Sequence, residues 1–295
     1  LSLSTPTMTT RLLFLVLIGL PNIIFAQVRL NEAVSSNSIY LDEDNDSPDW
    51  FELYNSGTQT VDLSGFTLSD KADNPGKWTI PPGLVMAPDQ YAFFWASNKD
   101  RTDVTSYRTL VDRGDIFRYH IPASSVSDSW TSTGFDDTSW AEGPSGFGYD
   151  DGDDATIVPN GTRSVFLRRS FTVNTLEGLE ELLFDVDFDD GFVAYLNGTE
   201  IARVNMNGSR PAWNAFATEN YEARIVNEGL PLRFVVIDPA SLLIVGENTL
   251  SIQVHNVNEF SSDMSMIPFL TARYAGLNND GVVPPAILSL PRTSL

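Results

Sequence analysis

The 295-residue sequence contains no cysteine and only two histidines, His120 and His255. Without thiol groups there is neither a disulfide framework nor a cysteine nucleophile, and zinc sites built from cysteine and histidine lack ligands. The Gly-x-Ser-x-Gly segment that carries a hydrolase nucleophile is also absent. These absences favour a protein that is not an enzyme. His255 ends an alternating strand, which favours a structural hydrogen-bonding role at a sheet edge.

Positive charge is scarce as well: 18 lysines and arginines face 39 aspartates and glutamates, which leaves a formal net charge of −21. An acidic surface of this kind repels nucleic acid and anionic lipid. We therefore expect no nucleic-acid partner. The general interpretation is the soluble surface of an extracellular protein, and the specific one is that some acidic clusters coordinate calcium. No pattern in the sequence indicates an oligomeric state.

Long hydrophobic runs are missing except near the N-terminus, where residues 12–20 are apolar and follow Arg11. Pro21 breaks the run and Ala26 offers a small residue for cleavage, which is the pattern of a secretory signal peptide over residues 1–26. The alternative, a permanent membrane anchor, is disfavoured because the run is shorter than the roughly 20 residues that span a bilayer. Met8 is the expected initiator, with residues 1–7 upstream of the true start.

Residues 27–105 read as short strands separated by turns. Residues 50–54 and 91–95 are rich in aromatic side chains and are bounded by asparagine, serine and glycine, as strands between turns are. Val61 and Leu63 alternate with polar residues, which buries one face of a sheet and leaves the other in water. The pattern predicts an all-β sandwich.

A second β-region follows. Its clearest signal is an alternating strand at residues 182–189, with apolar residues on one face and three aspartates on the other: Asp185, Asp187 and Asp189. The Asp-Asp-Gly sequence at the end of this strand predicts a hairpin turn into residues 192–196. Asn-Gly at residues 197–198 predicts the next tight turn, since both positions need positive φ. Aspartates aligned on one strand do not flank a substrate, so glycosidase chemistry is not favoured there.

A set of motifs in the first β-region occurs in a fixed order. They are Asn31-Glu32-Ala33, residues 49–55 (DWFELYN), 61–66 (VDLSGF), 68–70 (LSD), 77–81 (KWTIP) and Pro88-x-x-Tyr91. In this order and spacing they resemble the lamin-tail domain of secreted bacterial proteins. The resemblance implies a small immunoglobulin-like β-sandwich at residues 27–105 in a bacterial protein that is secreted or held at the cell surface. Family members of this type are binding or spacing modules rather than enzymes.

A second set of motifs follows in the second β-region. They are Trp130 with residues 135–140 (FDDTSW), 146–150 (GFGYD), 166–171 (FLRRSF), 189–198 (DDGFVAYLNG) and 246–256. They resemble a galactose-binding-like jelly roll, which we assign to residues 106–275. The combination resembles the N-terminal part of spore-coat-kinase-like multidomain surface proteins. That resemblance implies that residues 276–295 are a linker to a missing C-terminal domain.

The acidic segment at residues 150–154 is the best candidate for a metal site. Asp150, Asp151, Asp153 and Asp154 surround a glycine, and carboxylate oxygens are the ligands that calcium prefers. If the loop curls, these residues supply enough oxygen for a hard cation. The alternative is an exposed acidic loop that binds no metal.

Sugar binding needs an aromatic side chain that stacks on the ring and polar groups beside it. Trp213 lies in a polar loop between Arg210 and Asn214, so we expect an exposed platform for a glycan or cell-surface component. Trp130 and Trp140 fit structural positions of the resembled family. The sequence thus predicts a non-catalytic extracellular binding or presentation module. The alternatives are a structural spacer, or an accessory region of a larger extracellular enzyme whose catalytic domain is elsewhere.

Overall fold

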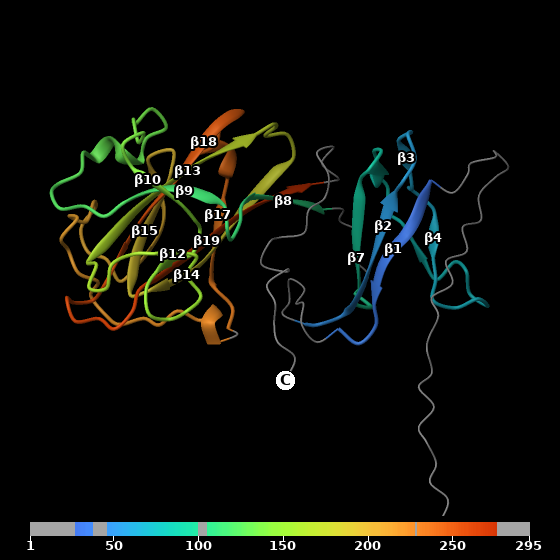
Figure 1. Ribbon diagram of the computed structural model, residues 1–295. Helices are drawn as coiled ribbons and strands as arrows, with labels where there is room; N and C mark the ends of the chain where they lie inside the picture. The colour runs from blue at the N-terminus through green and yellow to red at the C-terminus, as the bar shows by residue number, and fades with distance from the viewer. Residues whose placement is uncertain (1–26, 38–45, 100–104, 228, 276–295) are drawn as a thin grey trace, which may run out of the picture. The chain divides into compact units, whose positions relative to one another are not determined.

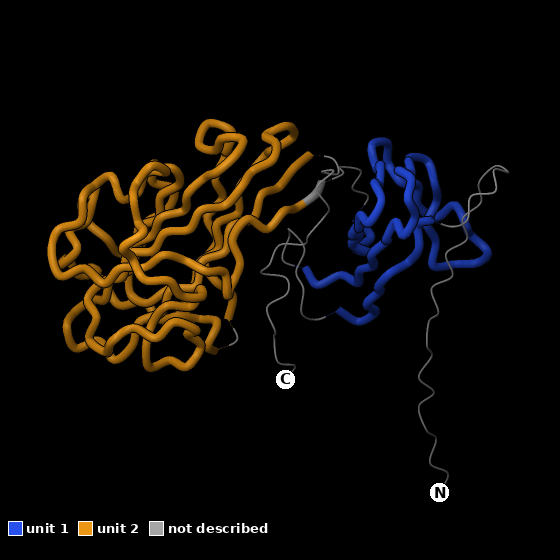
Figure 2. Tube along the Cα trace, turned by 45° about the horizontal axis from the view of Figure 1, so that its top comes forward, with its two compact units in different colours: residues 1–104, 276–282 blue, residues 105–275, 283–295 orange. Residues whose placement is uncertain are grey.

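The computed structural model describes residues 27–37, 46–99, 105–227 and 229–275. The expected signal peptide at residues 1–26 and the expected linker at residues 276–295 lie outside these ranges. The chain divides into two compact units, whose described parts fall within residues 27–99 and 105–275 (Figure 2). Within the described ranges, no helix is long and apolar enough to cross a membrane.

The first unit is built from short strands. They are β1 (Val28–Val34), β2 (Asp49–Asn55), β3 (Val61–Asp62), β4 (Thr67–Leu68), β5 (Trp78–Thr79), β6 (Val85–Met86) and β7 (Tyr91–Ala96). An antiparallel sheet has the order β1-β2-β7, while β3 pairs with β6 and β4 with β5. Their apolar side chains share one core that includes Leu53, Leu63, Ile80 and Met86. The unit is the expected immunoglobulin-like sandwich.

Asn55 shows how a motif residue ties this sandwich together. It ends β2 with no exposed surface, and its Nδ2 donates to the carbonyl oxygens of Gln59, Met86 and Ala87 at 2.8, 3.0 and 3.0 Å. Its Oδ1 accepts from the Gly57 backbone N–H at 3.0 Å. One buried amide therefore satisfies backbone groups that no strand ladder reaches, and it joins β2 to the end of β6.

The second unit is a larger sandwich. Its strands are β8 (Thr105–Val111), β9 (Ile116–His120), β10 (Ala141–Pro144), β11 (Phe147–Gly148), β12 (Thr156–Ile157), β13 (Ser164–Val173), β14 (Leu179–Asp189), β15 (Gly191–Leu196), β16 (Thr199–Val204), β17 (Leu232–Ile237), β18 (Gly246–His255) and β19 (Ser265–Ala275). Three short 3₁₀ turns in the described ranges complete it: η1 (Asp128–Thr131), η2 (Ile225–Asn227) and η3 (Pro239–Ser241).

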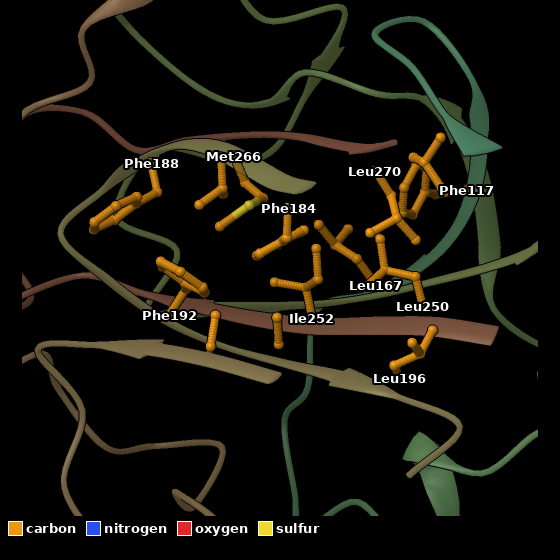
Figure 3. Close-up of a cluster of buried hydrophobic side chains, with 14 of the residues drawn as sticks. Phe117, Leu167, Phe184, Phe188, Phe192, Leu196, Leu250, Ile252, Met266 and Leu270 are labelled. Atoms are coloured by element: carbon orange, nitrogen blue, oxygen red, sulfur yellow. The ribbon is translucent and has the colours of Figure 1, made fainter. Parts of the chain in front are cut away.

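Two sheets make up this sandwich (Figure 1). One has six strands in the order β10-β9-β13-β18-β15-β16, and the other has four in the order β17-β14-β19-β8. Figure 3 shows side chains of β14 and β19 facing those of β15 and β18, with Phe184, Phe188 and Phe192 among the buried residues between them. The unit is all-β and of jelly-roll type, which confirms the predicted fold class.

The predicted hairpin at residues 189–191 is wrong. β14 pairs with β17 and β19, whereas β15 pairs with β16 and β18, so the two strands lie in different sheets. Asp190 therefore carries the chain from one sheet to the other. Both strands alternate towards the shared core, and for that reason the local pattern resembles a hairpin. The turn at Asn197 and Gly198 is confirmed, with φ of 50° and 89°.

A buried arginine organises the outer layer of the six-stranded sheet. The Arg168 side chain is 2% exposed, and its Nε donates to Asp137 Oδ2 at 2.7 Å. Its Nη1 donates to the carbonyl oxygens of Trp130 and Ser132. Trp130 and Trp140 are buried beside it, as predicted for structural positions. The guanidinium therefore holds η1 and the segment at residues 132–140 onto β13.

We predict that Arg168→Ala lowers the free energy of unfolding of the second unit by about 3 kcal/mol, because a buried charge pair loses one partner. Arg118→Ala is the matched control, since Arg118 pairs with Glu142 with the two side chains 35% and 57% exposed, and such a change costs below about 1 kcal/mol. Urea unfolding of the full chain measures both. Equal shifts for the two variants would contradict the structural role of Arg168.

Candidate functional site

The acidic segment at residues 150–154 is a tight loop between β11 and β12. These strands pair in parallel, and the Gly146 carbonyl accepts from the backbone N–H groups of Ala155 and Thr156 at 2.9 and 2.7 Å. Gly148 has no room for a side chain, because a Cβ there would overlap the Met264 carbonyl and the Asp154 carboxylate. The glycines of the sequence motif therefore let the loop fold back so that its carboxylates turn towards the protein.

Three of its aspartates converge. Asp151, Asp153 and Asp154 each place one carboxylate oxygen within 4.8 Å of the others. Both carboxylate oxygens of Asp153 and of Asp154, together with Asp151 Oδ1, are shielded from solvent and have no hydrogen-bond partner among the described residues. Buried carboxylates without partners are unfavourable unless a cation or a proton neutralises them.

Burial also shifts the acidity of this cluster. Burial first, and then the neighbouring Asp151 carboxylate, raise the pKa of Asp153 to about 7 and that of Asp154 to about 9. Arg113 lowers both values and donates from Nη2 to the Asp153 carbonyl oxygen at 2.6 Å, but burial outweighs it. The three carboxylates therefore either share protons with one another or bind a cation.

The donor set selects the kind of cation. Every candidate ligand atom in this cluster is a carboxylate oxygen, which suits a hard divalent ion and offers neither the nitrogen nor the sulfur that zinc prefers. Asp150 lies outside the cluster: its residue is exposed and its Oδ2 accepts from Asn160 Nδ2 at 2.5 Å. The structure thus brings together three of the four predicted residues.

The three aspartates of β14 are buried at 1 to 2% exposure, and two of them have fixed partners. Asp185 Oδ1 accepts from Arg233 Nε at 2.8 Å. Asp187 accepts from the backbone N–H groups of Arg224 and Ile225 at 2.8 and 2.7 Å. These two carboxylates hold the strand and the segment at residues 221–227 in place, which is a structural role.

Trp213, the expected aromatic platform, is partly exposed rather than freely exposed. Its ring packs against the buried cluster that contains Trp130 and Trp140. Its carbonyl oxygen accepts from Ser164 Oγ at 2.6 Å, which fixes the loop on the start of β13. Part of the residue stays accessible to solvent, and a role in ligand binding stays a prediction.

The two polar residues predicted beside Trp213 differ in their surroundings. Asn214 is exposed. Arg210 is exposed but engaged: its guanidinium lies 5.1 Å from the centre of the Tyr195 ring and donates to Thr131 Oγ1 at 3.0 Å. A further Arg210 contact reaches the carbonyl of Gly198 at 3.3 Å. Arg210 thus fastens the loop to η1 and to the turn after β15. Of the two residues, Asn214 is the better candidate for contact with a ligand.

His255 has the predicted hydrogen-bonding role but a different place. It ends β18, which lies between β13 and β15 in the six-stranded sheet, so it is not at a sheet edge. It is fully buried, with Nδ1 at 3.0 Å from the Ala215 carbonyl oxygen, and burial lowers its pKa to about 4. A neutral, packed imidazole of this kind serves the fold.

A second acidic cluster escaped the sequence analysis. Asp189, Glu222 and Asp263 each place one carboxylate oxygen within 4.8 Å of the others, although they come from three separate segments. The Asp-Asp-Gly sequence drew attention to Asp189 only as a turn residue. Nothing local marks Glu222 or Asp263, because only the folded unit brings their segments to Asp189.

The lamin tail domain family matches residues 27–207, which is more than half of the sequence. The chain belongs to this family. The match covers the first unit and continues through β16 of the second, so it extends beyond the residues on which the resemblance rested. No curated protein matches the sequence.

Several solved structures are similar in part to this family member. A β-glucuronidase of Bacteroides uniformis is 14% identical with a TM-score of 0.37, and the alignment covers 57% of this chain and 18% of that one. A β-glucuronidase of an uncultured Clostridium sp. is 18% identical with a TM-score of 0.38, covering 62% and 30%. The chain spans less than a third of these enzymes, and no functional conclusion follows at such TM-scores.

The carboxyl cluster predicts how stability depends on pH. The folded state of the calcium-free protein keeps protons on Asp153 and Asp154 that the unfolded state, with carboxyl pKa values near 3.8, releases. The free energy of unfolding of the second unit should therefore fall as the pH rises from about 4 towards about 9. Thermal unfolding in a chelator measures this slope.

The double variant Asp153→Asn with Asp154→Asn should reduce that slope, because these two side chains no longer titrate. The part that remains comes from groups such as Asp189, whose pKa burial raises to about 8. Asp150→Asn, which removes a neighbouring exposed carboxylate, should leave the slope as it is. Indistinguishable pH profiles for the double variant and the unmodified protein would show that the cluster is not buried in solution.

Proposed function

We propose that this member of the lamin tail domain family is a non-catalytic extracellular module whose second unit binds calcium and contacts carbohydrate. One observation supports the calcium part above all: five shielded carboxylate oxygens of Asp151, Asp153 and Asp154 have no partner among the described residues, and one oxygen of each residue lies within 4.8 Å of the others. A divalent ion there supplies the missing charge and ligands at once.

The same cluster does not suit catalysis by carboxyl groups. A glycosidase needs two carboxyl groups about 5 to 9 Å apart on either side of the bond to be cleaved. Here the oxygens converge on one another within 4.8 Å. On β14, the buried carboxylates of Asp185 and Asp187 are committed to Arg233 and to backbone N–H groups, respectively. This arrangement supports ion binding rather than bond cleavage.

An extracellular location agrees with this use of acidic residues. Calcium sites of extracellular modules bind with dissociation constants of about 10⁻⁴ to 10⁻³ M, so they are loaded where calcium is abundant. The leader pattern at residues 1–26, the absence of cysteine and the net charge of −21 are compatible with secretion or display at a cell surface.

For carbohydrate, we propose the surface formed by Trp213 and Asn214. The indole is partly exposed and held firmly by the core, and the exposed amide of Asn214 offers one acceptor and two donor hydrogens. A rigid aromatic edge beside a free amide is suited to a sugar ring with its hydroxyl groups. A spacer, or an accessory region of a larger extracellular enzyme or surface protein, is the alternative.

Calcium should stabilise the second unit. At a calcium concentration of about 100 times the dissociation constant, the free energy of unfolding rises by about 2.7 kcal/mol. For a unit of this size that is a rise in the melting temperature of about 5 to 10 °C over sodium chloride of equal ionic strength. Differential scanning calorimetry of the full chain measures it.

The part of the rise that comes from this site should be lost in Asp153→Asn with Asp154→Asn, so that the double variant is stabilised less than the unmodified protein. The rise should stay complete in Asp150→Asn, whose side chain lies outside the cluster. Equal melting curves in calcium and in ionic-strength-matched sodium chloride would reduce the loop to a solvated acidic turn.

The carbohydrate proposal is tested by retention on insoluble polysaccharides. Asn214→Ala should weaken retention about fivefold, the effect of losing one hydrogen bond of about 1 kcal/mol. Asn207→Ala, another exposed amide on the same connection, is the control and should bind normally. Trp213→Ala is a less clean test because the indole packs on the core. If no polysaccharide retains the protein, the spacer alternative is favoured. If the Asn214 variant is retained as well as the unmodified protein, Asn214 takes no part in carbohydrate binding.

A further inference from the structure

The second acidic cluster lies where three parts of the second unit meet. Asp189 is the last residue of β14, Glu222 lies in the segment before η2, and Asp263 lies just before β19. One carboxylate oxygen of each lies within 4.8 Å of the other two. Asp189 is almost completely buried, Asp263 is half-buried and Glu222 is exposed, so the cluster opens from the interior towards solvent.

Asp189 differs from an ordinary surface acid because it is buried and one of its oxygens has no partner among the described residues. The residue is 2% exposed, and its Oδ1 is shielded from solvent with no hydrogen-bond partner among the described residues. Ser265 stands directly opposite it in the β14–β19 ladder, and its buried Oγ is also without a partner there. An unpartnered buried carboxylate is highly unfavourable as an anion. The position therefore calls for a cation or a proton.

The carboxylate of Asp190 anchors the segments that carry the other two acids. Asp190 Oδ1 accepts from the Tyr221 backbone N–H at 3.0 Å, directly before Glu222. Its Oδ2 accepts from the Val257 backbone N–H at 2.8 Å, on the loop that carries Asp263. Both segments are thus anchored to the chain beside Asp189, and the three acids meet without a large rearrangement.

We propose that Asp189, Glu222 and Asp263 form a second site for a hard divalent cation such as calcium, separate from the site at residues 151–154. All donors are oxygens, and the Ser265 hydroxyl is a candidate additional ligand. The Ser262 hydroxyl donates to Asp263 Oδ1 at 2.8 Å, which orients that carboxylate. A bound ion would link the end of β14 to the segments that precede η2 and β19.

The two sites are neighbours but share no ligand. Tyr149 and Met264 pair through both backbone groups, with N···O distances of 3.0 and 3.3 Å, so the loop after Tyr149 and the residue before Met264 lie together. Asp151 is accordingly among the charges that act on Asp189. Because the residue sets differ, substitutions can remove one site at a time.

Isothermal titration of the full chain with calcium tests this proposal. The unmodified protein should bind two equivalents. Glu222→Gln should lose one of them, or weaken it about tenfold or more, since the loss of a ligand exceeds the effect of a lost outer-shell contact. Glu222 is exposed, so this variant should fold, and Glu219→Gln, an exposed acid in the same segment, should keep both equivalents. Asp263→Asn repeats the test from another segment.

The outcomes separate this site from the loop site. Asp153→Asn with Asp154→Asn should retain the equivalent that Glu222→Gln loses. If the site at residues 151–154 binds no calcium but the second site does, the unmodified protein binds one equivalent of calcium. Glu222→Gln then removes that equivalent. Two unchanged equivalents in both the Glu222 and the Asp263 variants would overturn the second site, as would a single equivalent that is lost only in the loop variant.

Discussion

The second unit depends on how it neutralises the carboxylates that it buries. β14 alternates core side chains with Asp185, Asp187 and Asp189, and loops cover the acidic face as completely as the second sheet covers the apolar one. A buried carboxylate needs a cation, a set of N–H donors or a proton. The three aspartates of this face differ in their partners. Those partners determine which neighbouring segments are held against the strand.

Asp185 and Asp187 have structural roles, whereas Asp189 belongs to the proposed cation site. Asp185 binds the Arg233 guanidinium across the sheet, and Asp187 draws the backbone of residues 224–225 onto the strand. Among the residues that the structure describes, no such donor reaches Asp189 Oδ1. The same holds for Asp151 Oδ1 and for both carboxylate oxygens of Asp153 and Asp154. The calcium binding that we propose would follow from acids that the fold buries and leaves uncompensated, with oxygen atoms as the candidate ligands.

Sequence patterns predicted much of this architecture because the relevant information is local. Period-two alternation located the strands, Asn197-Gly198 identified its turn, and the motifs from Asn31 to Tyr91 identified the lamin tail domain family. The carboxylates of residues 151–154 were also predictable, since one short loop carries them. The hairpin after Asp189 was wrong because strand pairing is non-local. Glu222 and Asp263 were missed for the same reason, as only the folded unit brings them to Asp189.

The central claim is that the aspartates of residues 151–154 enclose a calcium ion in the native protein. Crystals grown with calcium, with diffraction data collected at a long wavelength where calcium scatters anomalously, test it most directly. The account predicts an anomalous peak surrounded by carboxylate oxygens of Asp151, Asp153 and Asp154, at distances of about 2.3 to 2.6 Å. A map without a peak there, with the three carboxyl groups hydrogen-bonded to one another through shared protons, would contradict it.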